Sequence, residues 1–202
     1  MANQDPFKVV TGEVRMSYIH AFEPYAFENS DDAEAKYSAR IYIPKSDKDT
    51  LVKLQNAIKA VKSDEASIKK WGGAVPNKLD LPYYDGDAIA DEVPEAAGCY
   101  YLNLKNSRKP GVIDLSTGQA IDNPTEFYSG CYGRASFRLF AYNQKGKKGI
   151  GSSMSNLCKT RDGEPLGAVV TSAEDDFAEF VSANAPQKEF AAEEEEDPLA
   201  GL

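Results

Sequence analysis

The amino-acid sequence predicts a mainly β protein, a small antiparallel barrel with one main helix. Several short segments alternate between apolar and polar residues, as half-buried strands do. Only one segment has apolar residues at helical spacing, and turn-forming residues separate the segments. Five or six strands and one helix in a chain of 202 residues, with no internal repeat, favour a single closed sheet.

Two strands open the chain. Residues 7–19 (FKVVTGEVRMSYI) alternate, and Val10, Val14, Met16 and Tyr18 are expected on the apolar side, with Arg15 on the other. Residues 37–43 (YSARIYI) alternate in the same way and place Arg40 and Tyr42 on the polar side. The acidic stretch between these strands is expected to be a loop, and Pro44 ends the second strand.

The helix is predicted over residues 46–71 (SDKDTLVKLQNAIKAVKSDEASIKKW). Its apolar face is formed by Leu51, Leu54, Ile58 and Val61, and Ser46 or Asp47 is the expected cap. Lysines fill much of the opposite face, which is typical of a solvated surface helix. An irregular, acidic connector follows over residues 77–98.

The second half supplies the remaining strands. We expect strands over residues 98–105, 110–121 (with a turn at 116–118), 130–143 and 149–159, the last two joined by a turn rich in lysine and glycine. A short helix is expected over residues 173–180, and order is expected to fade after Ala185.

The charge of the chain is segregated. The net charge is −9, but residues 173–202 hold ten acids and one base, so the rest of the chain is balanced. Residues 99–161 carry ten lysines and arginines against three acids. The chain therefore combines a basic block in residues 99–161 with an acidic C-terminal segment.

The strand at 130–143 combines charge with aromatic rings. One side is small or apolar, and the other carries Tyr132, Arg134, Ser136, Arg138, Phe140 and Tyr142. Flat rings suit stacked bases, and cations between them suit phosphates, so this side is a candidate surface for single-stranded nucleic acid. Cross-strand aromatic pairs and arginine–carboxylate pairs are the alternative explanation.

Neighbouring segments extend the candidate surface. The polar sides of the other strands add Arg15, Arg40, Tyr42, Tyr101 and Lys105, and the lysine-rich turn adds Lys145, Lys147 and Lys148. With the local excess of positive charge, these residues favour a binding groove.

The C-terminal run AAEEEEDPLAGL is expected to be a disordered acidic tail. Such a run is commonly a solubility device. Tethered to a basic groove, it also mimics a phosphate backbone, so it is expected to compete with DNA and, when displaced, to bind other proteins. The residues assigned to this role are Glu193, Glu194, Glu195, Glu196, Asp197, Leu199 and Leu202.

Several stretches resemble a known family. KVVTGEVRMSY, YSARIYIPKSD, LPYYDGD, FYSGCYGRASFRLFAYN, KGIG and RDGEPLG, in this order over most of residues 8–180, are similar to phage single-stranded-DNA-binding proteins with an OB-fold. The resemblance implies a five-stranded Greek-key barrel over residues 1–180, a tail over 181–202, and single-strand binding in phage replication and recombination. It also implies replication or recombination proteins as partners of the tail.

Other classes of protein fit less well. The acidic loop with Asp85, Asp87, Asp91 and Glu92 would suit a metal-dependent nuclease, but its spacing does not match a calcium loop. The single histidine, His20, argues against most acid–base schemes, so neither an enzyme nor a cofactor is expected. A phage structural protein is the remaining alternative. Chain composition and three unpaired cysteines indicate a cytoplasmic protein without a membrane segment.

Overall fold

A computed structural model describes residues 5–26 and 34–167, all within one compact unit, Met1–Val169. The expected helix at 173–180, the boundary at 180/181 and the acidic tail lie outside the described residues. Among the described residues no helix has the length and apolar character needed to span a bilayer.

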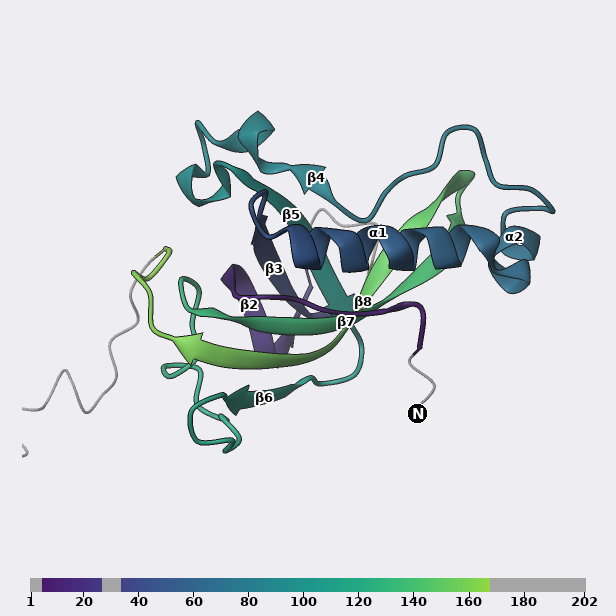
Figure 1. The fold of residues 1–202 in the computed structure, drawn as a ribbon. Coiled ribbons are helices and arrows are strands. Elements are labelled where there is room, and N and C mark those ends of the chain that lie inside the picture. Colours follow the sequence, from purple (N-terminus) through teal and green to yellow (C-terminus); the bar gives the residue numbers. More distant parts are fainter. Residues whose placement is uncertain (1–4, 27–33, 168–202) are drawn as a thin grey trace, which may run out of the picture. The chain divides into compact units, whose positions relative to one another are not determined.

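Five strands close into a barrel (Figure 1). They are β2 (Val14–Tyr25), β3 (Lys36–Pro44), β5 (Cys99–Asn106), β7 (Tyr132–Gln144) and β8 (Lys147–Arg161). The order is β2-β3-β5-β8-β7, and β7 pairs again with β2. All these pairings are antiparallel except β5–β8. The predicted OB-fold, a five-stranded Greek-key barrel, is confirmed.

Three short strands attach to the edges of this barrel. β1 (Lys8–Val10) pairs with β7, β4 (Tyr84–Asp85) with β5, and β6 (Gly111–Asp114) runs parallel to β8. The expected continuation of β6 is reduced to one bridge between Ile113 and Ala120. Two 3₁₀ turns, η1 (Gly86–Ile89) and η2 (Pro94–Ala96), lie in the acidic connector.

The first predicted strand is interrupted. The residues between β1 and β2 leave the hydrogen-bond ladder of the sheet. The Gly12 N–H instead donates to the Thr50 hydroxyl oxygen (2.7 Å). A Cβ at Gly12 would lie 2.4 Å from the Asp47 carboxylate, so a side chain there would disturb the helix cap. Because of this break Val9, not Val10, enters the core, and Val10 is 44% exposed.

The predicted helix is two helices, α1 (Lys48–Ser63) and α2 (Glu65–Lys70). Asp47, one of the two residues expected as the N-cap, caps α1. Asp64 separates the two helices because its backbone is extended. It also caps α2, since its carboxylate accepts a hydrogen bond from the Ser67 N–H (2.9 Å). α1 packs on β1 and β7 through Leu54, Ala57 and Val61.

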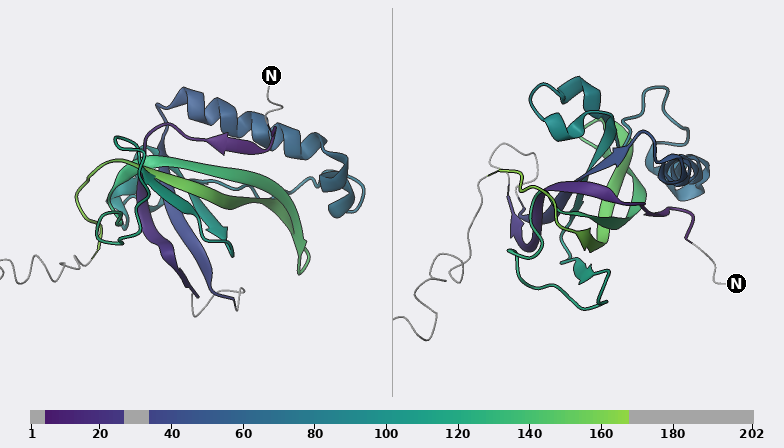
Figure 2. Two further views of the ribbon diagram at one scale, coloured as in Figure 1. Left: turned by 90° about the horizontal axis from the view of Figure 1, so that it is seen from below. Right: turned by 60° about the vertical axis from the view of Figure 1, so that its left-hand side comes forward.

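Figure 2 shows β2 and β3 extending away from α1, whereas the β7–β8 hairpin runs alongside α1 and bends away from it at the tip. The barrel interior holds the core, with Met16, Ile41, Leu102, Phe137 and Leu139 fully buried. The ends of β2 and β3 and the tip of the hairpin therefore project from the side of the barrel that the helix leaves open.

The only tryptophan holds the hairpin in place. Trp71 is 1% exposed, and its indole N–H donates to the carbonyls of Tyr142 (3.1 Å) and Gly149 (3.2 Å), one on each strand. The Lys148 ammonium donates to the Trp71 carbonyl. The end of α2 is thereby connected to both strands of the hairpin.

Trp71→Phe is expected to lower the free energy of unfolding by about 1–2 kcal/mol, because it removes the shared N–H and some buried apolar surface. Urea denaturation followed by circular dichroism measures the change. Phe127→Leu, at a site equally buried, is the control for lost packing alone. A stability equal to that of the unchanged protein would show that the indole does not hold the hairpin.

Candidate nucleic-acid interface

Predicted site residues from four strands meet in one row. Arg15 on β2 pairs in register with Tyr132 on β7 and with Tyr42 on β3. Tyr42 pairs with Tyr101 on β5, and Tyr101 pairs with Tyr84 on β4. Directly opposed residues in antiparallel strands project from the same face. The row therefore crosses five strands on the outer surface of the barrel.

One member of this row cannot contact a ligand from its surface position. Tyr42 projects outward, as predicted, but its side chain is only 1% exposed. Burial raises the pKa of its hydroxyl, and the nearby Glu95 carboxylate acts in the same direction. The expectation that Tyr42 presents a free ring to a base is wrong, because register neighbours flank the ring and the connector after β4 carries Glu95 close to it.

Two tyrosines of this row form a stack with a third ring and a guanidinium. The Arg40 guanidinium lies 4.7 Å from the Tyr18 ring centroid and 4.8 Å from the Tyr101 centroid. Tyr101 in turn stacks on Tyr84, with centroids 5.2 Å apart and planes inclined by 25°. We call Tyr18, Arg40, Tyr101 and Tyr84 the tyrosine–arginine stack. Its outer members are about half exposed, Tyr18 at 48% and Tyr84 at 53%.

The ring of Tyr18 reaches this position through an irregular backbone. The β2–β3 register shifts between Ser17 and His20, and Tyr18 has a φ of +48°. A bulky residue at positive φ is an outlier that costs about 1–3 kcal/mol, and it persists only where the surrounding structure holds it in place. Alternation alone placed Tyr18 on the apolar side of its strand, and this prediction is wrong because the bulge turns the ring outward.

The predicted alternation of β7 is confirmed. Its inward residues are buried, whereas Arg134, Arg138 and Phe140 are exposed. Two of these cations already have partners within the protein: Arg134 donates to the Thr11 carbonyl (3.4 Å), and Arg138 pairs with Asp5 (2.7 Å). Hydrogen bonding to Arg138 lowers the pKa of Asp5.

Aromatic rings of the β7 face lie over glycines of neighbouring segments. A Cβ at Gly149 would lie 2.5 Å from the Tyr142 ring, and one at Gly151 would lie 2.6 Å from the Phe140 ring. These glycines let the rings lie flat against the backbone of β8. Phe140 remains 41% exposed, whereas the Tyr142 hydroxyl donates to Asp80 (3.2 Å).

Four of the candidate residues line two separate hollows. The first, about 310 Å³, lies over β3 and β5, and its lining includes Tyr18, Arg40 and Lys105. The second, about 350 Å³, lies between β7 and α2, and its lining includes Arg138 and Phe140. No residue lines both. Arg40, Tyr101 and Lys105 are thus brought together with Tyr18, whereas Arg138 and Phe140 belong to a second surface.

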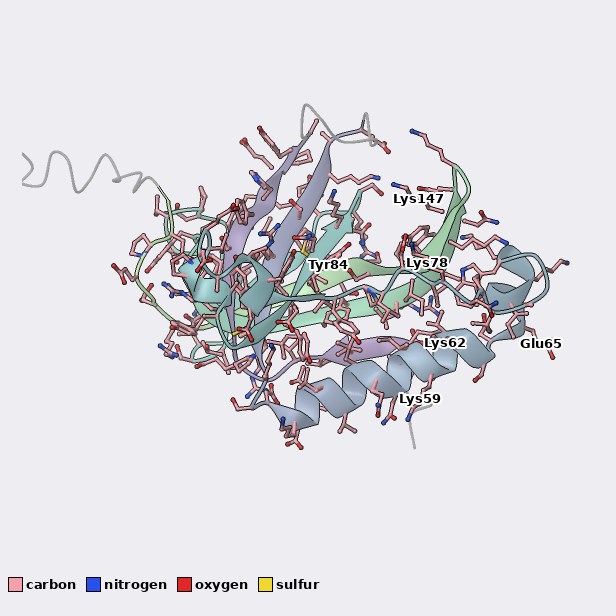
Figure 3. All side chains as sticks on the ribbon, turned by 90° about the horizontal axis from the view of Figure 1, so that it is seen from above. Lys59, Lys62, Glu65, Lys78, Tyr84 and Lys147 are labelled. Atoms are coloured by element: carbon pink, nitrogen blue, oxygen red, sulfur yellow. The ribbon has the colours of Figure 1, made fainter. Side chains whose placement is uncertain are left out.

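The lysine-rich turn forms the tip of the β7–β8 hairpin. Lys145 (φ +48°) and Gly146 (φ +80°) both have the left-handed backbone that tight hairpins require. Lys147 is exposed, whereas Lys148 is partly buried against Trp71. Figure 3 shows Tyr84 in the middle of the view, between the β2–β3 pair and the hairpin that carries Lys147.

The acidic loop is occupied by a protein cation. Lys45 Nζ lies 2.7 Å from an Asp85 carboxylate oxygen and 2.6 Å from one of Asp87. Hydrogen bonds to Lys45 lower the pKa of both carboxyls, and Asp85 also caps η1. Among the residues that the structure describes, no cluster of three metal-ligating side chains exists. Both of these carboxylates are therefore paired with a lysine ammonium in this structure.

Known phage proteins are similar to this chain in sequence. Residues 7–191 match the model of the family described as "Enterobacter phage Enc34, ssDNA-binding protein". Putative protein p50 of Acyrthosiphon pisum secondary endosymbiont phage 1 is 32% identical over 175 residues, which cover 83% of this chain and 91% of that protein.

Solved structures agree with these sequence matches. The single-stranded DNA-binding protein of bacteriophage Enc34 in complex with ssDNA superposes with a TM-score of 0.67 and 26% identity, over 80% of this chain and 90% of that one. The single-stranded DNA-binding protein gp2.5 of bacteriophage T7 has a TM-score of 0.57 at 14% identity, over 85% and 99% of the two chains, and shares the fold. The chain therefore belongs to the phage single-stranded-DNA-binding protein family of which the Enc34 protein is a member.

Proposed function

We propose that this protein binds single-stranded DNA with little dependence on sequence, and that it protects and presents single strands during phage DNA replication and recombination in the host cytoplasm. The observation that carries the proposal is the tyrosine–arginine stack on the outer face of β3 and β5. OB-folds bind oligonucleotides on their second and third strands, which are β3 and β5 here, and on the two loops that flank them.

The chemistry of the stack suits unpaired bases. Tyrosine rings and a guanidinium plane stack on any base, because every base has a π-face. Bases in a duplex are already stacked on each other and do not present these faces. Arg15, Arg40 and Lys105 lie within or beside the stack and supply charge for the phosphates. This binding requires no bond to be broken, so no catalytic step is proposed.

Fluorescence anisotropy with a labelled single strand and the corresponding blunt duplex tests the proposal. We expect the single strand to bind at least tenfold more tightly, since a stacked base contributes about 1–3 kcal/mol. Equal affinity for the two would overturn the proposal. Cleavage of either DNA in magnesium, abolished by Asp85→Asn, would instead support the nuclease alternative.

We also propose that residues 1–180 carry DNA binding and that residues 181–202 regulate it. The acids Glu193–Glu196 and Asp197 carry the charge of about five phosphates, so they suit the same cations as DNA does. Leu199 and Leu202, at the end of this segment, are the apolar groups that we assign to the pocket of a replication or recombination protein.

Truncation after Gln187 is expected to tighten single-strand binding several-fold at low salt, because it removes a tethered competitor. Titrations of the full chain and the truncated chain at two salt concentrations measure the difference. A tail of the same composition in scrambled order is the control: it restores competition with DNA but not binding to partner proteins. An affinity that truncation leaves unchanged at every salt concentration would mean that the tail serves only solubility.

A further inference from the structure

The hollow over β3 and β5 has features of a built binding site. Its 310 Å³ lie at the lower end of the range for small-molecule pockets. Tyr18 and Arg40 border it, and Ser38, Asn103 and Lys105 line it together with the strand backbones. Ser38 pairs in register with Lys105, and Arg40 with Asn103, so these four side chains project from the same face.

Ser38 is buried without a hydrogen-bond partner. It is 6% exposed, and its hydroxyl makes no hydrogen bond. Across residues 5–26 and 34–167, the other buried side-chain polar atoms in this condition are Arg15 Nε and the Tyr42 hydroxyl. All three lie on the outer face of the β2–β3 pair. Buried polar atoms without partners are rare, and of these three residues Ser38 is the one that lines the hollow, where a ligand would supply its missing hydrogen bond.

Asn103 presents a donor of known orientation. Arg40 Nε donates to Asn103 Oδ1 at 2.8 Å, which requires the carbonyl oxygen of the amide to face Arg40. The amide nitrogen, with its two hydrogens, therefore faces away from Arg40, on a side chain that is exposed. The contact that completes the stack thus also sets which group Asn103 offers to a ligand.

The hollow consequently offers more donors than acceptors. The Asn103 amide nitrogen and the Lys105 ammonium only donate, and the Ser38 hydroxyl rotates to donate or accept. Such a set fits a base edge with a carbonyl oxygen, as thymine, cytosine and guanine have. Adenine has no carbonyl oxygen. Each of its ring nitrogens has one lone pair and accepts one hydrogen bond, whereas a carbonyl oxygen accepts two, and its exocyclic amino group would oppose the Asn103 amide.

We propose that this hollow holds one base of the bound strand and selects a carbonyl-bearing base over adenine through Ser38 and Asn103. The inference rests on the proposed binding of single-stranded DNA. The base stacks against the Tyr18 ring, and its carbonyl oxygen accepts from the Asn103 amide and from the rotated Ser38 hydroxyl. The other bases of the strand lie on the sequence-tolerant part of the surface, so the selection acts at a single position.

A scan with a thymine isostere tests the proposal on the full-length protein. A thymidine oligomer of about 12 nucleotides, within the length that one OB-fold covers, is first trimmed to the shortest form that keeps full affinity. Each thymine is then replaced in turn by difluorotoluene, which keeps the shape and the π-face of thymine but lacks its carbonyl oxygens. We expect one position to lose affinity by about three- to tenfold, the size of one or two neutral hydrogen bonds. Adenine at that position should weaken binding similarly, and guanine should not.

Two variants connect this position to the hollow. Ser38→Ala and Asn103→Ala should each reduce the loss caused by difluorotoluene, while Ser63→Ala, on the exposed face of α1, leaves it unchanged. Circular dichroism verifies that each variant is folded. Tight binding of thymidine oligomers with equal affinity at every scanned position would overturn this inference and leave single-strand binding intact. No binding of any oligomer would overturn the proposed function itself.

Discussion

Raising the salt concentration from 50 to 200 mM is expected to weaken single-strand binding about 100-fold. We expect five cations on or beside the tyrosine–arginine stack and at the hairpin tip to contact phosphates: Arg15, Arg40, Lys105, Lys145 and Lys147. Each phosphate contact to a single strand contributes a slope of about −0.7 to the dependence of log affinity on log salt. Five contacts give a slope near −3.5, and a fourfold rise in salt gives the expected loss.

Variants of single cations separate the two candidate surfaces. Arg40→Gln should make the salt slope shallower by about 0.7, because it removes one phosphate contact. Arg138→Gln is the matched change on the β7–α2 surface, where Arg138 already pairs with Asp5 and lies 4.7 Å from the Phe7 ring centroid. We expect a smaller change there, since DNA would have to displace the carboxylate. Affinity independent of salt would contradict phosphate recognition at either surface.

Part of this surface could be predicted from the sequence because alternation within one strand is a local property. Period two placed Arg134, Arg138 and Phe140 on the outside of β7 correctly, and likewise Arg40 on β3 and Tyr101 on β5. Alternation gives the face of a residue and not its neighbours. The division of these residues between two hollows depends on how the barrel closes, and that depends on register between distant strands.

The residues that sequence reasoning missed lie where the backbone is irregular. Tyr18 projects outward because of a bulge, and Tyr84 belongs to a two-residue strand inside a connector without periodicity. Tyr42 lies in a regular strand, and its outward face was predicted correctly. Its burial was missed because that burial depends on segments far away in sequence. Asp64 could have indicated the break in the helix, as Asp is a strong cap, but Asp also occurs inside exposed helices.

Removing the exposed rings of the tyrosine–arginine stack is expected to weaken single-strand binding more than any other change on the surface of the barrel. Tyr18→Ala and Tyr84→Ala should each cost about 1–3 kcal/mol, or roughly 5- to 150-fold in affinity, because each ring offers a face to a base. The two rings lie at opposite ends of the stack. The double variant should therefore lose nearly the sum of the two free energies.

Arg40→Lys tests whether the planar guanidinium of the tyrosine–arginine stack contributes to binding beyond its charge. Lysine retains the charge but loses the planar guanidinium that lies between Tyr18 and Tyr101, and it cannot reproduce the Nε bond to Asn103. We therefore expect Arg40→Lys to keep the salt slope of the unchanged protein while losing several-fold in affinity, whereas Arg40→Gln alters both. Titrations over a range of salt concentrations give both quantities from one data set.

Phe140→Ala, on the β7–α2 surface, is the matched aromatic change for this series. Phe140 is 41% exposed, close to the exposure of Tyr18, so its removal should disturb the fold to a similar extent. If DNA lies on β3 and β5, Phe140→Ala retains affinity within about threefold, since exposed positions away from the ligand contribute little. A large loss with Phe140→Ala, together with none for Tyr18→Ala and Tyr84→Ala, would place the strand on the β7 face. The hollow between β7 and α2 would then be the binding surface, because no residue belongs to both hollows.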